Sequence, residues 1–276
     1  MSDSEIIKPE DIVVNPPEED IPGVKYEVAQ KIEKMLQNGR RYFGSSGASL
    51  THQVHNPEPD SGIKPELAKV GLEGERSTTK FLQDWMKDKP GAVLIDSVHI
   101  NMDYKTDDIE DEIDEEKLDE ESGLIDGKDT DHVLLIGDEV ILIDTKRWKS
   151  KRKYSVSDNG SILRSNKTFP GGQVKMKNAI YLWLEYLYED AVITGMVLIN
   201  TDEITVIRNY NWYNQSFRLV ELARFEELLN ERWKNISDEN KTSINSTLVS
   251  QVALSAIKPF DEYSKVFDME ALHKFK

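Results

Sequence analysis

DTDHVLLIGDEVILIDTKRW, residues 129–148, reads as two apolar strands joined by a tight turn. The pair Gly137-Asp138 is typical of a two-residue hairpin loop, because glycine readily adopts the positive φ of a type II′ turn. Apolar residues occupy both faces of the two strands, in the runs 133–136 and 140–143. Strands of this kind belong to a sheet that is covered on both sides. The stretch therefore predicts the central hairpin of an α/β domain.

Three charged residues at the open end of this hairpin are expected to face the same side. With a two-residue loop, Ile136 faces Glu139, and counting back along both strands places Asp131 opposite Asp144. Side chains alternate with period two, so Lys146 projects from the same face. Opposed residues have Cβ atoms roughly 4.5–5.5 Å apart, and two carboxylates that close repel each other unless a cation lies between them. A three-residue turn would instead separate the two aspartates onto opposite faces.

Composition limits the classes of function. The 276 residues suffice for one sizeable core with extensions, and the absence of cysteine excludes disulfides, thiolate metal sites and a cysteine nucleophile. No run approaches the roughly 18 apolar residues of a membrane helix. The first residues lack the basic and apolar segments of a signal peptide. These features favour a cytoplasmic protein without a membrane partner.

Charge is distributed unevenly along the chain. The net charge of −16 argues at first against a nucleic-acid partner, yet residues 103–121 hold twelve acids and two lysines, whereas residues 146–177 hold ten basic residues and one acid. A positive surface beside a carboxylate site is what a phosphodiester substrate requires. An ordinary solvated face is the alternative explanation of the basic run. The acidic run is expected to be an exposed insertion, or alternatively a lid folded over the basic run.

The other segments predict alternating helices and strands, with tails at both ends. The arm 1–22 is acidic and proline-rich and is expected to be disordered or extended; 23–70 holds a helix and a linker (44–63), and 236–276 is a C-terminal extension. The further expected elements are helices over 26–43, 71–90, from Gln173 onward, 225–233 and 248–257, strands over 92–102, 193–199, 203–208 and 217–220, and a second hairpin at Asn159-Gly160.

Four motifs follow one another along residues 71–233. They are Gly-x-x-Gly-Glu75 opening a helix, Thr-Asp131-His-Val, Ile-Asp144-Thr-Lys146-Arg-Trp, and Gln173 opening another helix. In this order and spacing they resemble the nuclease-related domain (NERD) family, which belongs to the PD-(D/E)xK phosphodiesterase superfamily. The resemblance implies an α/β, restriction-endonuclease-like mixed sheet flanked by helices over 71–235, with N- and C-terminal helical extensions outside it.

The resemblance also implies roles for individual residues. Asp131 and Asp144 would be the metal carboxylates, and Lys146 would be the catalytic lysine. Glu75 would be the glutamate that the first helix contributes, and Gln173 a polar group near the phosphate. From local pattern alone, Glu75 is also explained as an acid in the first helical turns, where it favourably meets the macrodipole. The family usually has glutamate where this chain has Asp144, which is one methylene shorter.

The chemistry expected of these residue types is hydrolysis assisted by a divalent cation. Mg²⁺, for which Mn²⁺ can substitute, binds oxygen ligands and keeps several waters, so two carboxylates and the backbone carbonyl of Thr145 suffice. His132 alternates to the face opposite Asp131 and is expected to be structural. The basic residues expected to contact nucleic acid, with DNA favoured, are Arg147, Lys149, Lys151, Arg152, Lys153, Lys175 and Lys177.

The expected function is thus a Mg²⁺-dependent nuclease, most simply a DNA endonuclease. The alternative is a non-catalytic nucleic-acid-binding or assembly module that keeps the fold, with its extensions contacting a protein partner or a second copy of the chain. The two hypotheses differ in metal binding. The alternative predicts no Mn²⁺ binding and no effect of Asp144→Asn on function.

Overall fold

The computed structural model describes 7–19, 21, 24–48, 50, 65–99, 129–148, 151–156, 161–165, 167–173, 180, 183, 187, 191–203, 205–206 and 217–256. The acidic run 103–121 and most of the expected linker 44–63 lie outside these residues. None of the helices in the described part of the chain combines the length and the apolar character that crossing a membrane requires.

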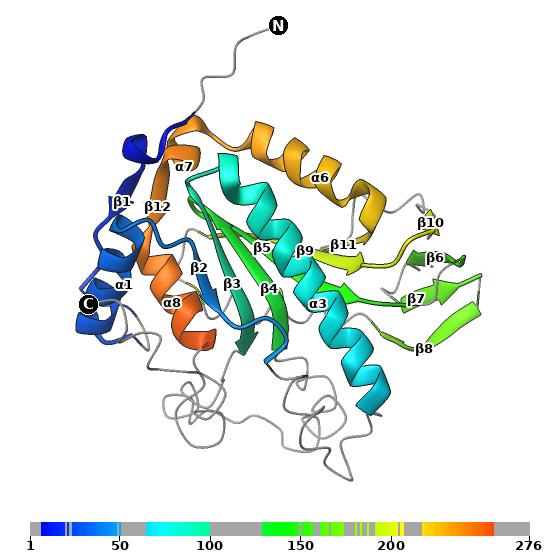
Figure 1. Cartoon of the computed structure of the whole chain (residues 1–276). Coiled ribbons are helices and arrows are strands. Elements are labelled where there is room, and N and C mark those ends of the chain that lie inside the picture. Colours follow the sequence, from blue (N-terminus) through cyan, green and yellow to red (C-terminus); the bar gives the residue numbers. More distant parts are fainter. Residues whose placement is uncertain are drawn as a thin grey trace, which may run out of the picture.

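A mixed sheet of six strands forms the centre of the molecule, in the order β11-β9-β5-β4-β3-β2 (Figure 1). Its strands are β2 (Tyr42–Gly44), β3 (Ala92–His99), β4 (Asp129–Ile136), β5 (Glu139–Lys146), β9 (Val192–Ile199) and β11 (Phe217–Glu221). The neighbours β3, β4 and β5 run antiparallel, whereas β5, β9 and β11 are parallel to one another. The expected α/β class with a mixed sheet between helices is confirmed.

The register of the central hairpin is the expected one. Ile136 pairs with Glu139, so the loop is the two residues Gly137 and Asp138, and Gly137 has a φ of 57°. The pairing continues without a shift to His132 opposite Ile143. A three-residue turn is therefore excluded, and the alternation of side chains at the open end of the hairpin is the one predicted.

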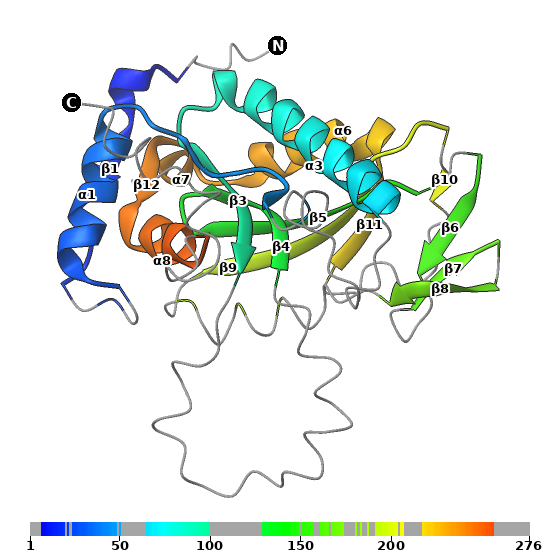
Figure 2. The ribbon, with the colours of Figure 1, turned by 60° about the horizontal axis from the view of Figure 1, so that its bottom comes forward.

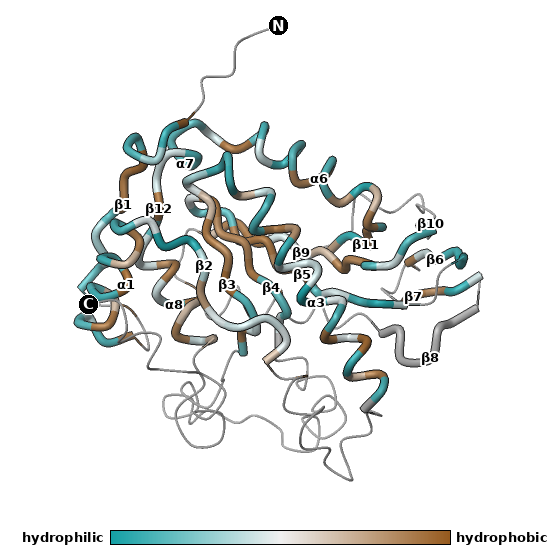
Figure 3. The backbone as a smooth tube through the Cα atoms, viewed as in Figure 1, coloured by the Kyte–Doolittle hydropathy of each residue, from teal (hydrophilic) through white to brown (hydrophobic). Residues whose placement is uncertain are grey.

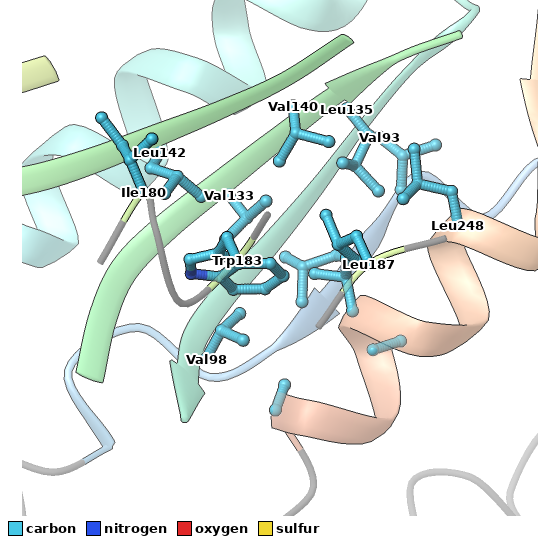
Figure 4. Packing of buried hydrophobic residues seen from close by; sticks show 14 of the residues in the cluster. Val93, Val98, Val133, Leu135, Val140, Leu142, Ile180, Trp183, Leu187 and Leu248 are labelled. Atoms are coloured by element: carbon cyan, nitrogen blue, oxygen red, sulfur yellow. The ribbon is translucent and has the colours of Figure 1, made fainter. Parts of the chain in front are cut away.

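Each face of the sheet has its own cover of helices (Figure 2). On one face, α3 (Pro65–Trp85) and α6 (Leu222–Asn235) pack with Leu134 and Ile141 in one apolar cluster. On the other face, Ile180 and Trp183 lie beside Leu142 and Val133, and α8 (Ser246–Ala256) packs on β3, with Leu248 near Val93 (Figure 4). The hydrophobic colouring of the middle of β3 and β4 matches this double cover (Figure 3). Strands apolar on both faces are thus buried on both faces, as the sequence predicts.

The terminal segments contribute to the same core. The helix α1 (Tyr26–Gln37) ends before Gly39, whose φ of 83° is suited to a helix C-terminus, so the expected helix 26–43 is too long. Residues 42–44 instead form the edge strand β2, parallel to β3. Ile32, Leu36 and Phe43 are buried in the apolar cluster that also contains Leu248 of α8. The described parts of both terminal segments therefore pack on the central sheet.

Part of the N-terminal arm is a strand. β1 (Val13–Asn15) pairs in parallel with β12 (Ser243–Asn245), so the expectation that 1–22 is disordered or loosely extended is wrong for these three residues. The expected C-terminal helix is confirmed as α8. The remaining short elements are η1 (Pro9–Asp11), η2 (Met86–Asp88) and α7 (Asp238–Thr242).

A second, smaller sheet has the order β10-β6-β7-β8. Its strands are β6 (Lys153–Val156), β7 (Ser161–Arg164), β8 (Lys167–Gln173) and β10 (Thr205–Val206). The expected second hairpin is confirmed by the antiparallel pairing of β6 with β7, although its turn lies outside the described residues. The expected helix start at Gln173 is wrong, because this residue ends β8 and pairs with Ser161.

Candidate active site

The open end of the central hairpin brings three charged side chains together. The Nζ atom of Lys146 lies 2.6 Å from Oδ1 of Asp144, and Oδ2 of Asp131 accepts a hydrogen bond of 2.6 Å from the N–H of Thr145. The side chains of Lys146 and Asp144 are 41% and 23% exposed, so solvent reaches the group. The ammonium group therefore faces the carboxylates, as the alternation along β5 predicts.

Glu75 approaches this group from the middle of α3. The helix begins at Pro65 and not near Gly71, so the explanation of Glu75 as a first-turn acid is wrong. Only 5% of Glu75 is exposed. The loop after β2 helps to bury it, since a Cβ on Gly47 would lie 3.4 Å from Oε2 of Glu75 and would overlap Leu72. This loop is the start of the expected linker, and its role in the site was missed.

The electrostatics show an excess of negative charge. Burial raises the pKa of Glu75 to about 9, and the charge of Asp131 adds to this while Lys146 opposes it. Burial and the charge of Asp144 raise the pKa of Asp131 to about 6. Desolvation of the ammonium group works to lower the pKa of Lys146, but the surrounding carboxylates outweigh it and raise this pKa above its ordinary value. One lysine thus does not compensate three carboxylates.

The donor set suits a hard divalent cation in its chemistry but is not arranged around one. Carboxylate and carbonyl oxygens, here from Asp131, Asp144, Glu75 and Thr145, are the ligands that Mg²⁺ takes in proteins. Among the described residues, no group of three or more acidic, histidine or cysteine side chains is placed to hold a metal ion as it stands. Asp144 is instead engaged by Lys146, and Asp131 by a backbone N–H. Binding a cation would require these carboxylates to turn.

A buried polar network lies behind the hairpin, beneath α3. His132 is fully buried, with Nδ1 at 2.8 Å from Oδ1 of Asp96 and Nε2 at 3.1 Å from Oγ1 of Thr145. The other oxygen of Asp96 accepts hydrogen bonds of 2.6 Å from Thr79 and 3.0 Å from Tyr42. His132 therefore has the structural place expected of it.

The network's other members were missed by the sequence analysis. Asp96 was not singled out, although an aspartate inside the apolar strand β3 is a signal that it meets a buried partner. Asn200, which follows the last residue of β9, was missed as well, and its position directly after an apolar strand was the available signal. Thr78 and Thr79 on α3 carried no local signal, because threonine on a helix is common.

The expected nucleic-acid contacts are only partly described. Arg147 forms an ion pair of 2.9 Å with Glu73 on α3, and Lys151 one of 3.6 Å with Glu203. Arg152 and Lys153 are exposed at the start of β6. Lys149, Lys175 and Lys177 lie outside the described residues. The backbone of Gln173 lies in the smaller sheet, away from the strands that carry the acidic cluster.

Comparisons of the chain with protein-family models, with curated proteins and with solved structures give no match. The candidate site therefore has to be judged from its own geometry and charge.

Proposed function

We propose that this chain is a metal-dependent nuclease with a restriction-endonuclease-like fold, and that it hydrolyses phosphodiester bonds in DNA. The observation that carries the proposal is the cluster at the open end of the hairpin, where Asp131, Asp144 and Glu75 surround Lys146 with more negative charge than it compensates. Strongly raised pKa values of acids next to a lysine, in a position that solvent reaches, are typical of functional sites. The mixed sheet between helices is compatible with the fold.

Each residue of the cluster has a chemical task in this proposal. A bound Mg²⁺ or Mn²⁺ would lower the pKa of a water and polarise the phosphoryl group. Asp131, Asp144 and the carbonyl of Thr145 would hold the cation, and Asp144 would exchange its contact with Lys146 for one with the metal. The ammonium group of Lys146 would then be free to hydrogen-bond the attacking water or a phosphoryl oxygen as charge develops there. Glu75 would add charge or orient a water.

Basic side chains near the cluster support a polyanionic substrate. Arg147 directly follows Lys146 and is partly exposed, and Lys151, Arg152 and Lys153 are exposed where β6 begins. Contacts of this kind hold the phosphate backbone without reading its sequence. The net charge of −16 on the whole chain makes a local basic surface more important for binding, because the remainder of the protein repels nucleic acid.

The test is cleavage of plasmid DNA by the full-length chain in Mg²⁺. Lys146→Ala should lower the rate by at least about 10²-fold, since it removes a group that stabilises charge in the transition state. Lys87→Ala is a matched control, because Lys87 is 76% exposed and its ion pair is with neighbouring Asp84. It should cut at the wild-type rate. A wild-type protein inert on single- and double-stranded DNA and RNA, in Mg²⁺ and in Mn²⁺, would overturn the proposal.

One observation favours the non-catalytic alternative. The close pair of Lys146 with Asp144 occupies the carboxylate that a metal would need, and the described residues contain no ready-made metal group. Titration calorimetry with Mn²⁺ distinguishes the two functions. A nuclease should bind Mn²⁺ and lose this binding with Asp144→Asn, whereas a binding or assembly module should give no heat of binding with either protein.

A further inference from the structure

Asn200 joins β5 to α3 at the edge of the acidic cluster. Its backbone N–H donates a hydrogen bond of 2.9 Å to the carbonyl of Lys146. Its side-chain Nδ2 lies 3.0 Å from the carbonyl oxygen of Gly74, 2.7 Å from Oγ of Ser77 and 2.7 Å from Oγ1 of Thr78. Asn200 is only 9% exposed, so these contacts are made largely away from water. One residue thus contacts the strand of Lys146 and the helical turn of Glu75.

The turn of α3 that Asn200 holds lies directly on β5. A Cβ on Gly74 would be 3.3 Å from Cβ of Arg147 and 3.6 Å from Cγ2 of Thr145, so the helix backbone comes as near as side chains allow. The Gly74 carbonyl accepts from Asn200, and Glu75 is the next residue along the helix. The distance of Glu75 from Asp131 and Asp144 is therefore set by how this turn docks.

The same amide begins a series of contacts that leads to Asp131. Asn200 donates to Thr78, whose hydroxyl lies 3.3 Å from that of Thr145, and Thr145 in turn contacts His132. The backbone N–H of Thr145 holds Asp131. These contacts are continuous from Asn200 to Asp131, so displacing the amide should disturb both the turn of Glu75 and the backbone N–H that holds Asp131.

We propose that Asn200 is a positioning residue, which fixes the spacing of the backbone segments that carry Glu75 and, through Thr78 and Thr145, Asp131, so that both carboxylates can turn toward one cation. It touches neither substrate nor cation. The part of this proposal that concerns cation binding rests on the proposed function. The docking of the Glu75 turn can be measured without metal or substrate.

A matched control contacts the same helix from another element. Asn230 of α6 also holds α3, because its Oδ1 accepts a hydrogen bond of 2.9 Å from Nε1 of Trp85, ten residues after Glu75. Asn230→Ala loosens the far end of the helix and leaves the turn of Glu75 in place. Comparison of Asn200→Ala with Asn230→Ala therefore separates local positioning from general stability.

The first measurement is amide hydrogen exchange of the metal-free full-length proteins. Asn200→Ala should speed exchange in residues 74–78 by at least about tenfold, while the turn near Trp85 stays protected. Asn230→Ala should give the reverse pattern. Uniformly faster exchange along α3 in both variants would overturn the proposal, whether or not the protein is a nuclease.

The second measurement is Mn²⁺ affinity by calorimetry in two backgrounds. Asn200→Ala should weaken binding about 10- to 100-fold, as loss of an outer contact to a metal ligand does. In a Glu75→Gln background the further loss should be smaller than in the wild-type background, because only the effect transmitted to Asp131 remains. Asn200→Ser, which keeps a hydroxyl donor, should recover part of the affinity, and Asn230→Ala should bind as wild type. Equal losses of Mn²⁺ affinity in both backgrounds would contradict the proposal and show that Asn200 has only a general structural role.

If wild-type protein binds no Mn²⁺, the proposed function fails. The exchange measurement then still decides whether Asn200 fixes the turn of Glu75.

Discussion

Two groups of polar side chains lie at the same end of the central hairpin, and they differ in how their charge is compensated. In the group of Asp96, His132 and Thr145, each of the three side chains has hydrogen-bonding partners. In the group of Glu75 and Asp131, the pKa values are raised to about 9 and about 6, first because burial removes water from the carboxylates and second because the carboxylates repel one another. The first arrangement stabilises the fold. The second opposes it, as expected of the cation site that we propose.

The largest expected effect is a loss of stability when the hydrogen-bonded group of Asp96, His132 and Thr145 is broken. Asp96→Ala leaves the buried polar atoms of His132, Tyr42 and Thr79 without their acceptor, which should cost about 3–5 kcal/mol of the free energy of unfolding. Urea denaturation measures this, with Asp138→Ala at the hairpin turn as a control for an aspartate that is only half-buried. A loss below about 1 kcal/mol would mean that the network adds little to the fold.

Replacing a carboxylate in the group of Glu75 and Asp131 is expected to raise the free energy of unfolding. Glu75→Gln keeps the shape of the side chain and no longer needs to take up a proton on folding, so the metal-free protein should become more stable at pH 8. One unit of pKa shift is equivalent to about 1.4 kcal/mol, and a gain of at least this size is expected. The measurement is urea denaturation in a chelator. If the variant were less stable than wild type, the carboxylate would be favourably bonded and the contrast between the two groups would disappear.

The pH dependence of stability provides a second test of the raised pKa of Glu75. The folded-state pKa of Glu75, about 9, lies above its ordinary value of 4.5, so between these values the unfolded chain is ionised while the folded chain keeps the proton. Folding then takes up a proton, and stability of the metal-free wild type should fall as pH rises from about 5 to about 9. Glu75→Gln should fall much less, with the two curves meeting near pH 4.5. Parallel curves would contradict the raised pKa.

The smallest expected effect tests how closely α3 packs against β5, between the two groups. Gly74→Ala favours the helix intrinsically by about 1 kcal/mol, but its methyl group would press on the side chain of Arg147 at 3.3 Å. We expect a net change in stability under about 1 kcal/mol, together with weaker Mn²⁺ binding because the turn of Glu75 moves outward. Calorimetry and urea denaturation on the same samples test this. Unchanged affinity would show that the helix has room to move.

Sequence patterns predicted the parts of this molecule that depend on short-range rules. The Gly137-Asp138 loop fixed the register by local turn chemistry, and the period of two then placed Asp131, Asp144 and Lys146 on one face. The apolar runs likewise predicted a sheet covered on both sides. These features follow from neighbours in the chain, so no distant contact was needed to find them.

Features that depend on distant contacts were not predicted. Residues 42–44 have the aromatic character of a strand, but only the exposed edge of β3 turns them into one, and they were assigned to a helix. Gln173 was placed at a helix start because the following residues have helical spacing, whereas pairing with Ser161 keeps it in a strand. Asn200 and Asp96 gain their meaning only from partners on α3 and β4, far away along the chain.

The pairing of β1 with β12 affects when the protein can complete its folding during synthesis. Asn15 and Ser246 are bonded across 231 positions of the chain, and α8, which follows at once, covers the face that carries Val93. Until β12 and α8 have been made, the part of this face that α8 covers stays open to water. A nascent chain would therefore carry its acidic residues long before it has a rigid frame to hold them, which would delay the proposed cutting of nucleic acid until residues 243–256 have been made.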